Sequence, residues 1–273
     1  MKSYRYHTIL SIAGSDSGGG AGIQADLKTF SALGCFGTTA ITAITVQNTL
    51  GVQDVHCIPA GIVSGQIKAV LDDLQPAAVK IGMVPNLEVA EAIVEALREY
   101  PVPVIFDPVL ISSSGHKLVT DETIEVYRSK LLPLCTLITP NISEAMALTG
   151  TPINGLDDMK VAARQLVSMG CKAALITGGH LTGSHLHDVL VDHQGLEQVF
   201  TSQFIQSTNL HGTGCTLSSA VAAWVARGLS LVEAVREAIQ YVQEAIEQGK
   251  DVQVGAGNGP LNHFYNPHKL NKS

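Results

Sequence analysis

Short apolar runs alternate along the chain with stretches in which apolar residues recur at helical spacing. Six runs of strand length, bounded by Gly, Pro or polar residues, cover 8–13, 38–46, 77–82, 102–107, 136–140 and 172–177. The stretches 86–99, 121–132 and 157–169 have the period of amphipathic helices. Because continuous apolar strands suit a sheet buried on both faces, the pattern predicts an α/β fold with a doubly wound, mostly parallel sheet flanked by helices.

The second half of the chain departs from this alternation. Segments 187–195 and 197–205, separated at Gln194-Gly195, predict an antiparallel hairpin at one edge of the sheet. Helices are expected over 213–227 and 230–248, joined at Gly228, and the polar end, 266–273, is expected to fray. The sequence contains no linker and no internal repeat, so 1–273 is expected to be one domain. Ligands of such folds bind at the carboxyl ends of the strands.

Composition narrows the class of protein. The 273 residues, 45% hydrophobic and 15% charged, are enough to bury a large core. The net charge is -7 and the basic residues are scattered, so nucleic-acid binding is not expected. No apolar run is long enough to cross a bilayer, and the N-terminus lacks the long apolar core of a signal peptide. We therefore expect a cytoplasmic protein without membrane contact.

Five cysteines without a CxxC pair argue against a disulfide framework and a zinc site. Cys35, Cys57, Cys135 and Cys171 lie in apolar or strand-like surroundings and are expected to be inert core thiols. The fifth, Cys215, stands out because it lies between a glycine turn and an apolar helix.

A glycine run, 18–20, joins the first strand to a helix. It matches neither the P-loop pattern GxxxxGK[ST] nor the dinucleotide pattern GxGxxG, which disfavours a Rossmann dehydrogenase. Two interpretations stay open. The run is a tight strand-to-helix turn, or Asp16 and Asp26 on either side of it hold a hydroxyl or amine of a small ligand.

Polar or polarizable residues follow several of the strands. Gln47 and Met83 are suited to line one pocket. Asp107 ends a strand, and Pro108 turns the chain directly after it. Its carboxylate therefore either faces a metal or phosphate or caps a turn. Asn141 and Glu144 have the spacing of a helix capping box, and their alternative role is to hold Mg²⁺, which takes only one or two carboxylates directly.

The segment "HGTGCTLSSAVAAW" combines a glycine loop with the start of an apolar helix. Backbone N–H groups at a helix N-terminus form an anion-binding site, suited here to a phosphoryl group in transfer. A thiol in that field is expected to have a lowered pKa, so that Cys215 acts as a base or nucleophile. The alternative is a buried cysteine in a glycine-capped helix.

Seven segments, in order, resemble the ribokinase-like kinases and specifically the hydroxymethylpyrimidine/phosphomethylpyrimidine kinase family: "IAGSDSGGGAGIQADLKTF", "ITAITVQNT", "KIGM", "DPV", "LITPNISEA", "GGH" and "HGTGCTLSSAVAA". The resemblance implies ATP-dependent phosphorylation of 4-amino-5-hydroxymethyl-2-methylpyrimidine and then of its monophosphate, in thiamine biosynthesis. It also implies ATP and Mg²⁺ as cofactors and a homodimer.

The same resemblance implies roles for individual residues. The pyrimidine would be contacted by Gly14, Asp26, Gln47, Met83 and Val109. Metal and phosphates would be organised by Asp107, Asn141 and Glu144, with Asp107 and Glu144 on the metal. The nucleotide would also meet Thr177 and Asp188. The anion hole would be formed by Gly212, Thr213 and Gly214, and Cys215 would take the place of the Asp base of sugar kinases.

One position departs from the family pattern. Family members have Lys where this chain has Thr177, which predicts weaker ATP binding or slower transfer unless Lys117, Lys172 or a second cation substitutes. Two alternatives to the pyrimidine kinase stay open. One is a pyridoxal kinase, because pyridoxal is another flat heteroaromatic ring with a hydroxymethyl group. The other is a weakly catalytic pyrimidine-binding sensor, because of Thr177. Residues 111–117 are either a mobile lid or a plain surface turn.

Overall fold

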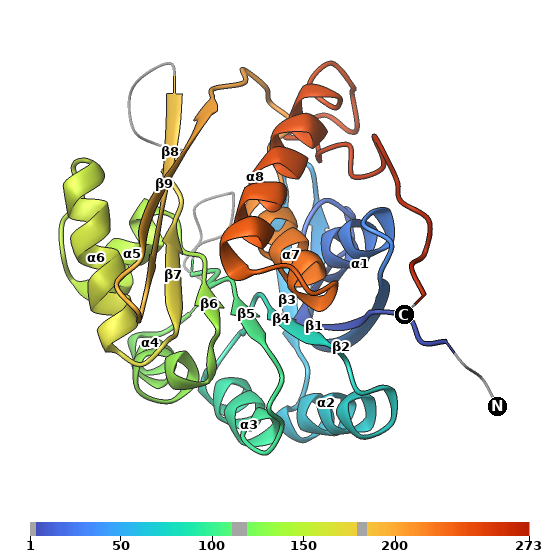
Figure 1. The fold of residues 1–273 in the computed structure, drawn as a ribbon. Helices are drawn as coiled ribbons and strands as arrows, with labels where there is room; N and C mark the ends of the chain where they lie inside the picture. The colour runs from blue at the N-terminus through green and yellow to red at the C-terminus, as the bar shows by residue number, and fades with distance from the viewer. Residues whose placement is uncertain (1–3, 111–118, 179–184, 273) are drawn as a thin grey trace.

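The computed structural model describes residues 4–110, 119–178 and 185–272, and these form one nine-stranded sheet with helices on both faces (Figure 1). The strands are β1 (Thr8–Asp16), β2 (Phe36–Asn48), β3 (Gly51–Cys57), β4 (Ala78–Ile81), β5 (Val104–Phe106), β6 (Leu137–Ile138), β7 (Ala173–Ile176), β8 (His185–Asp192) and β9 (Glu197–Gln203). The candidate lid 111–117, with Lys117, lies outside the described residues.

The sheet has the order β3-β2-β1-β4-β5-β6-β7-β8-β9. Neighbours from β2 to β7 pair in parallel, whereas β3 pairs antiparallel to β2, and β8 and β9 form an antiparallel hairpin next to β7. The expected mostly parallel sheet and its edge hairpin are confirmed. The carboxyl ends of β1 and of β4 to β7 consequently meet along one edge of the sheet.

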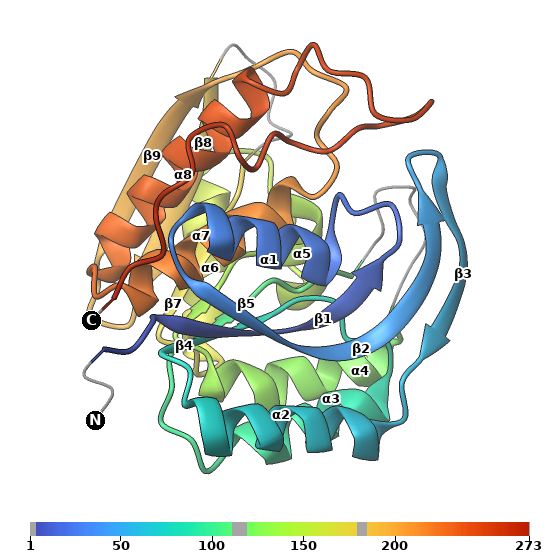
Figure 2. The same cartoon turned by 90° about the vertical axis from the view of Figure 1, so that its right-hand side faces the viewer.

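Two layers of helices cover the sheet. Their bounds are α1 (Gly22–Ala32), α2 (Ala60–Leu74), α3 (Leu87–Leu97), α4 (Asp121–Val126), α5 (Ile142–Thr149), α6 (Leu156–Ser168), α7 (Thr213–Ala226) and α8 (Leu231–Glu247). Helices α1, α7 and α8 lie on one face, and α2 to α6 lie on the other (Figures 1 and 2). A separate buried cluster of apolar side chains lies under each layer, because the central strands bury both faces.

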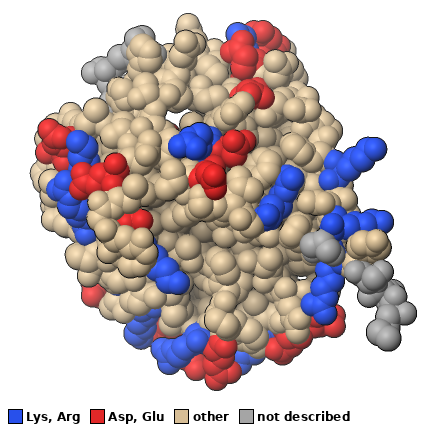
Figure 3. All heavy atoms as spheres, viewed as in Figure 1, with Lys and Arg blue, Asp and Glu red and all other residues tan. Residues whose placement is uncertain are grey.

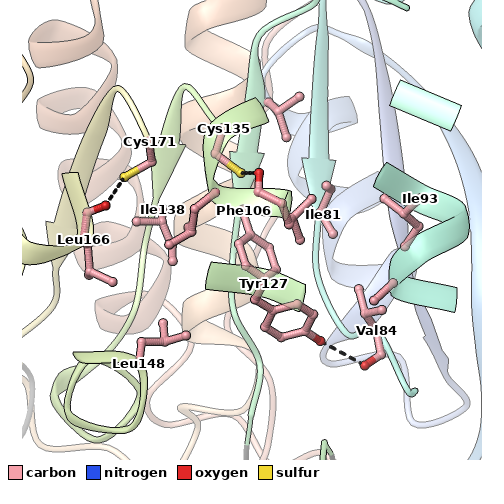
Figure 4. Close-up of a cluster of buried hydrophobic side chains, with 14 of the residues drawn as sticks. Ile81, Val84, Ile93, Phe106, Tyr127, Cys135, Ile138, Leu148, Leu166 and Cys171 are labelled. Atoms are coloured by element: carbon pink, nitrogen blue, oxygen red, sulfur yellow. Dashed lines mark hydrogen bonds between the residues drawn. The ribbon is translucent and has the colours of Figure 1, made fainter. Parts of the chain in front are cut away.

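The cluster under α2 to α6 also contains buried polar groups that form hydrogen bonds with backbone carbonyls (Figure 4). The ring of Tyr127 packs edge-on to Phe106, with centroids 5.1 Å apart, and its hydroxyl donates to the Val84 carbonyl at 3.1 Å. The Cys171 thiol donates to the Leu166 carbonyl. Both buried polar groups thus have an acceptor and add little penalty to the apolar core.

Four elements differ from the sequence-based expectation. The helix expected over 121–132 breaks into α4, a π-turn at Tyr127–Leu131 and a 3₁₀ turn at Leu132–Leu134, because Pro133 lacks the N–H that an α-helix requires. Strand β3 and helix α2 were not anticipated. The run at 38–46 is part of a longer strand that forms, with β3, a ribbon extending beyond the rest of the sheet (Figure 2).

The C-terminal residues lie against the body of the protein. The His268 amide donates to the Ala32 carbonyl at 2.7 Å, and the Asn271 amide donates to the Gly34 carbonyl at 2.9 Å. On the face shown in Figure 3, acidic and basic side chains are interspersed. Within the described ranges, we find no helix long and apolar enough to span a bilayer.

Candidate active site

A cavity of about 510 Å³ lies at the carboxyl ends of the strands, where the doubly wound fold predicts ligand binding. It is lined by nearly all of the residues proposed from the sequence: Gly14, Gln47, Met83, Asp107, Val109, Asn141, Glu144, Thr177, Asp188, Gly212, Thr213, Gly214 and Cys215. Residues from both ends of the chain thus meet in one space, and Asp26 is the proposed residue that does not line it.

The end of the cavity near β1 and β2 is lined by Gly14, Gln47 and Met83. A Cβ on Gly14 would lie 3.1 Å from Sδ of Met83, so the glycine leaves space beside the sulfur. The side-chain amide of Gln47 lies 3.2 Å from the Thr45 hydroxyl and 3.2 Å from Nε2 of His211. This end therefore offers a polarizable wall and an amide that can form a hydrogen bond.

The glycine turn after β1 is held by the Asp16 carboxylate. Its oxygens accept the backbone N–H groups of Gly18, Gly20 and Ala21 at 2.8, 3.0 and 2.8 Å, and Oδ2 also lies 2.9 Å from Nε2 of His211. Burial raises the pKa of Asp16, but His211 and the turn amides outweigh it and keep that pKa below its usual value. The run is thus the tight turn considered above, and Asp16 also lines the cavity.

The loop before α7 packs directly on this turn. Gly212 has a φ of 85°, and a Cβ there would overlap the Gly20 carbonyl oxygen, so both the conformation and the close approach require glycine. The loop places Gly214 and Cys215 in the first turn of α7, where backbone N–H groups lack intrahelical acceptors. The positive end of α7 therefore faces the cavity, which suits a phosphate group.

Two buried carboxylates lie near the middle of the cavity, after β5 and β6. Asn141 and Glu144 form the capping box of α5, with amide-to-side-chain distances of 3.0 Å in both directions. Burial and the neighbouring Asp107 raise the pKa of Glu144 to about 8. Burial also raises the pKa of Asp107, although Lys80 opposes the shift. Both acids would gain from a bound cation that offsets their burial.

These acids fit Mg²⁺ and not a metal that requires a full protein shell. Among the described residues, no group of three or more His, Cys, Asp or Glu side chains is arranged to hold a metal ion. Mg²⁺ keeps several waters and takes one or two carboxylates together with substrate phosphates, a donor set that Asp107 and Glu144 can supply.

Thr177 and Asp188 lie at the other end of the cavity, after β7 and on β8. The Thr177 amide donates to the Pro140 carbonyl, and Asp188 accepts the Gly178 amide at 3.0 Å. Burial raises the pKa of Asp188 to about 6. Lys172 precedes β7, whereas Thr177 follows it, so the extended chain of β7 holds them about 16 Å apart. Lys172 therefore does not replace the cation missing at Thr177.

The thiol of Cys215 differs from the expectation. Burial raises its pKa to about 12, and Asp107 and Asp26 add to the shift, whereas Lys80 lowers it only partly. The prediction of a lowered pKa was wrong. The helix field is outweighed because protein atoms around the thiol limit its contact with water and two acids lie beside it.

Asp26 is the proposed residue that lies outside the cavity lining. Its side chain is fully buried and lies behind the cavity, where Oδ1 accepts from Lys80 Nζ at 2.9 Å and from Ser219 at 2.7 Å, while Oδ2 accepts from Ser11 at 2.5 Å. Burial alone would lower the pKa of Lys80, but Asp26 and neighbouring acids raise it above its usual value. The structure therefore places Asp26 in an ion pair beneath α7.

Two polar residues at or beneath the cavity were not predicted, and one thiol expected in the core is exposed. His211 belongs to the segment before α7, but no role was predicted for it. A polar side chain next to the start of a helix was the feature that could have indicated one. Lys80 is the charged residue within the apolar run 77–82. Because a buried charge requires a partner, its position indicated a buried ion pair. Cys57 is exposed at the end of β3, whereas Cys35, Cys135 and Cys171 are buried as expected, and all five cysteines are free.

The fold and site define the class: a doubly wound α/β protein with an anion-binding helix start and two buried acids between a ring pocket and a second polar end. Comparison with known families agrees. Residues 16–262 match the family model described as phosphomethylpyrimidine kinase. The chain belongs to the phosphomethylpyrimidine kinase family.

Individual relatives are similar over nearly the whole chain. Hydroxymethylpyrimidine/phosphomethylpyrimidine kinase of Bacillus subtilis is 46% identical over 270 residues, covering 98% of each chain. A crystal structure of phosphomethylpyrimidine kinase from Clostridium difficile is 45% identical, with a TM-score of 0.78 over 88% of this chain and 99% of that one. An ADP complex of Bacillus subtilis pyridoxal kinase is 35% identical, with a TM-score of 0.87 over 95% and 98%.

Proposed function

We propose that the protein phosphorylates 4-amino-5-hydroxymethyl-2-methylpyrimidine with ATP, and then phosphorylates the monophosphate. The observation that carries this proposal is the linear arrangement of the cavity. The ring pocket lies at β1 and β2, the buried acids Asp107 and Glu144 follow β5 and β6, and the polar end with Thr177 and Asp188 lies at β7 and β8. A hydroxymethyl ring, a metal-bound phosphate and a nucleotide can thus lie in line, as phosphoryl transfer requires.

Each part of the site has a role in that reaction. The substrate hydroxyl oxygen attacks the γ-phosphorus while the bond to the ADP oxygen breaks, and the hydroxyl proton passes to a phosphate oxygen or to water. The start of α7, at Gly212 to Gly214, would stabilise the negative charge of the transferring group. Asp107 and Glu144 would hold Mg²⁺, which neutralises phosphate charge when it is bound. Asn141, Thr177 and Asp188 would contact the nucleotide.

Cys215 would contact the substrate hydroxyl. A thiol with a pKa of about 12 is protonated at neutral pH, so it must lose its proton before it can act as a base. Because phosphoryl transfer depends mainly on positioning and charge neutralisation, we assign the thiol a smaller share of the rate than the start of α7. The protonated thiol would form a hydrogen bond with the substrate hydroxyl and orient it.

Pyridoxal is the competing substrate. Pyridoxal kinases are similar in fold at 32–35% identity, compared with 43–46% for the hydroxymethylpyrimidine/phosphomethylpyrimidine kinases. Both substrates are flat rings with a hydroxymethyl group, and a difference of one substituent is worth only about 1–3 kcal/mol in a pocket. The higher identity favours the pyrimidine.

The deciding experiment is direct. Purified protein is incubated with Mg·ATP and, separately, hydroxymethylpyrimidine, its monophosphate and pyridoxal, and the products are identified by mass. Formation of pyrimidine mono- and diphosphate supports the proposal. Phosphorylation of pyridoxal alone would show that the substrate is pyridoxal and not the pyrimidine. Pyrimidine binding without product supports the sensor alternative and implicates Thr177.

We further propose that the protein requires Mg²⁺, acts as a homodimer in the cytoplasm and folds as one domain over 1–273. The buried acids support the metal, since a cation would offset their burial. Ile44, Val46 and Leu50 on the β2–β3 ribbon are 48%, 53% and 72% exposed, which supports a subunit contact there. Five free cysteines fit a reducing compartment. One continuous sheet supports a single domain.

A further inference from the structure

The Gln47 side chain is held between a hydroxyl and an imidazole at the cavity wall. One end of its amide lies 3.2 Å from Oγ1 of Thr45, and the other lies 3.2 Å from Nε2 of His211. The same His211 nitrogen lies 2.9 Å from Oδ2 of Asp16. The ring is fixed, because its side chain is only 12% exposed and a Cβ on Gly20 would collide with it.

The hydrogens in this cluster determine which way the Gln47 amide faces. The Asp16 carboxylate already accepts three backbone N–H groups of the glycine turn, so it is an acceptor toward His211 as well. Nε2 of His211 therefore carries a proton and donates it to Asp16. An N–H of Gln47 aimed at the same nitrogen would bring two donors together. The conflict disappears when the Gln47 carbonyl faces His211 and its NH₂ group faces Thr45, an exchange of two groups of nearly equal shape.

That orientation leaves one donor for a ligand. The Thr45 hydroxyl donates to the Ser15 carbonyl at 3.0 Å, so it accepts from Gln47 and satisfies one of its two N–H groups. The second N–H belongs to a side chain that lines the cavity. We propose that Asp16 and His211 are positioning residues that turn the Gln47 amide to offer an N–H donor, so that the site selects a ring with an acceptor nitrogen. This inference rests on the proposed function, whose pyrimidine substrate carries two ring nitrogens.

The test compares substrates that differ only in that acceptor. The two single deaza analogues of hydroxymethylpyrimidine, each with one ring nitrogen replaced by C–H, are assayed beside the parent compound. For wild type, we expect kcat/KM to fall about tenfold for the analogue that lacks the recognised nitrogen. His211→Phe should reduce this discrimination to about twofold or less, with the KM for ATP unchanged.

A double-mutant cycle separates positioning from a merely structural role. Gln47→Ala should also lose the discrimination, and Gln47→Ala/His211→Phe should lose no more than Gln47→Ala alone, because His211 acts through Gln47. His193→Phe, in the exposed turn between β8 and β9, is the matched control and should keep the wild-type ratio. Thermal melting checks that each variant is folded.

Each outcome has one meaning. If wild type phosphorylates the pyrimidine and His211→Phe keeps the wild-type ratio, or if the two substitutions add in the double variant, the positioning inference is overturned and the proposed function stands. If wild type discriminates against neither deaza analogue, the inference is likewise overturned. If wild type phosphorylates no pyrimidine, the proposed function fails, and this inference fails with it.

Discussion

Buried charge is concentrated beneath the start of α7. Lys80, from the centre of β4, meets Asp26 of α1, and Ser219 of α7 donates to the same carboxylate. Ser218, the preceding residue, donates to Asp107 at 3.3 Å. Two neighbouring serines of α7 thus connect the helix to the ion pair and to a cavity acid. The position of Cys215 one turn earlier depends on both contacts.

Lys80→Met should destabilise the protein by about 3–5 kcal/mol, because it leaves Asp26 charged, buried and without an ionic partner. Lys80→Met/Asp26→Asn removes both charges and should recover part of that loss. Urea denaturation measures both free energies of unfolding. Lys68→Met on the exposed side of α2 is the control and should change stability by less than about 0.5 kcal/mol. A double variant no more stable than Lys80→Met would contradict this account of the pair.

The cysteines should differ sharply in their reaction with iodoacetamide. Only the thiolate reacts, and burial raises the pKa of Cys215 to about 12, so it should be modified slowly at about pH 7.5. Cys57 is exposed and should be modified first, while Cys35, Cys135 and Cys171 are buried. Peptide mass mapping over time gives the order, with Cys57→Ser to confirm the assignment. Cys215 reacting as fast as Cys57 would show that its thiol is activated without ligand.

At the scale of elements, the N-termini of α5 and α7 reach the cavity by different means. Helix α5 begins with a side-chain capping box, whereas α7 begins at Gly212 without a side-chain cap. The Thr213 amide donates to the Leu210 carbonyl, and the next amides, of Gly214 and Cys215, stay available. The capping box was predictable from the spacing of Asn141 and Glu144. Its burial was not, because burial depends on how α5 packs against β5 and β6. The raised pKa of Glu144 is therefore a property of the assembled fold.

Gly212→Ala should impair the protein far more than Gly228→Ala. Both glycines have positive φ, 85° and 90°, and Ala at either position costs about 1–2 kcal/mol of backbone strain. A Cβ at Gly228 meets open space, whereas a Cβ at Gly212 overlaps the Gly20 carbonyl and must displace the loop before α7. We expect kcat/KM of Gly212→Ala to fall at least about 100-fold. Equal kinetic effects of the two substitutions would contradict the importance of this contact.

Glu144→Gln should stabilise the metal-free protein in a pH-dependent way. The pKa of Glu144 is raised from 4.5 to about 8, so the folded protein keeps a proton that the unfolded chain releases, and stability falls as pH rises through this window. The side-chain amide of the Glu144→Gln variant cannot ionise, so the stability of the variant does not fall with pH for this reason. We expect equal melting temperatures at about pH 4.5 and a variant more stable by at least about 2–4 °C at about pH 8.5. A difference of the same size at both pH values would contradict the shift.

At the scale of the whole molecule, the order of strands could be anticipated only in part. The apolar runs predicted the central strands, and the rule that ligands bind at their carboxyl ends led to residues that, apart from Asp26, all line the cavity. The ion pair of Asp26 was not predicted, because the sequence does not reveal that Lys80 lies across from it. Strand β3 was missed because its residues are half exposed and carry polar side chains, which is the pattern of a surface segment.

The exposed apolar side chains of the β2–β3 ribbon predict a contact between two copies of the protein. Because side chains alternate along a strand, Thr45 and Gln47 face the cavity while Ile44 and Val46 point to the opposite side, where both are about half exposed. Burying such apolar side chains against a second copy would remove them from water. We therefore expect wild type to have twice the monomer mass by light scattering.

Ile44→Lys/Val46→Lys should then be monomeric, because two charged side chains in an apolar contact lack partners. Ile62→Lys, which alters another exposed isoleucine, 59% exposed on α2, is the control and should stay dimeric. Since Thr45 and Gln47 lie on the same strand, loss of the contact should also loosen the ring pocket and raise the KM for the pyrimidine more than that for ATP. A monomeric wild type, or a dimeric double variant, would show that the ribbon is not the subunit contact.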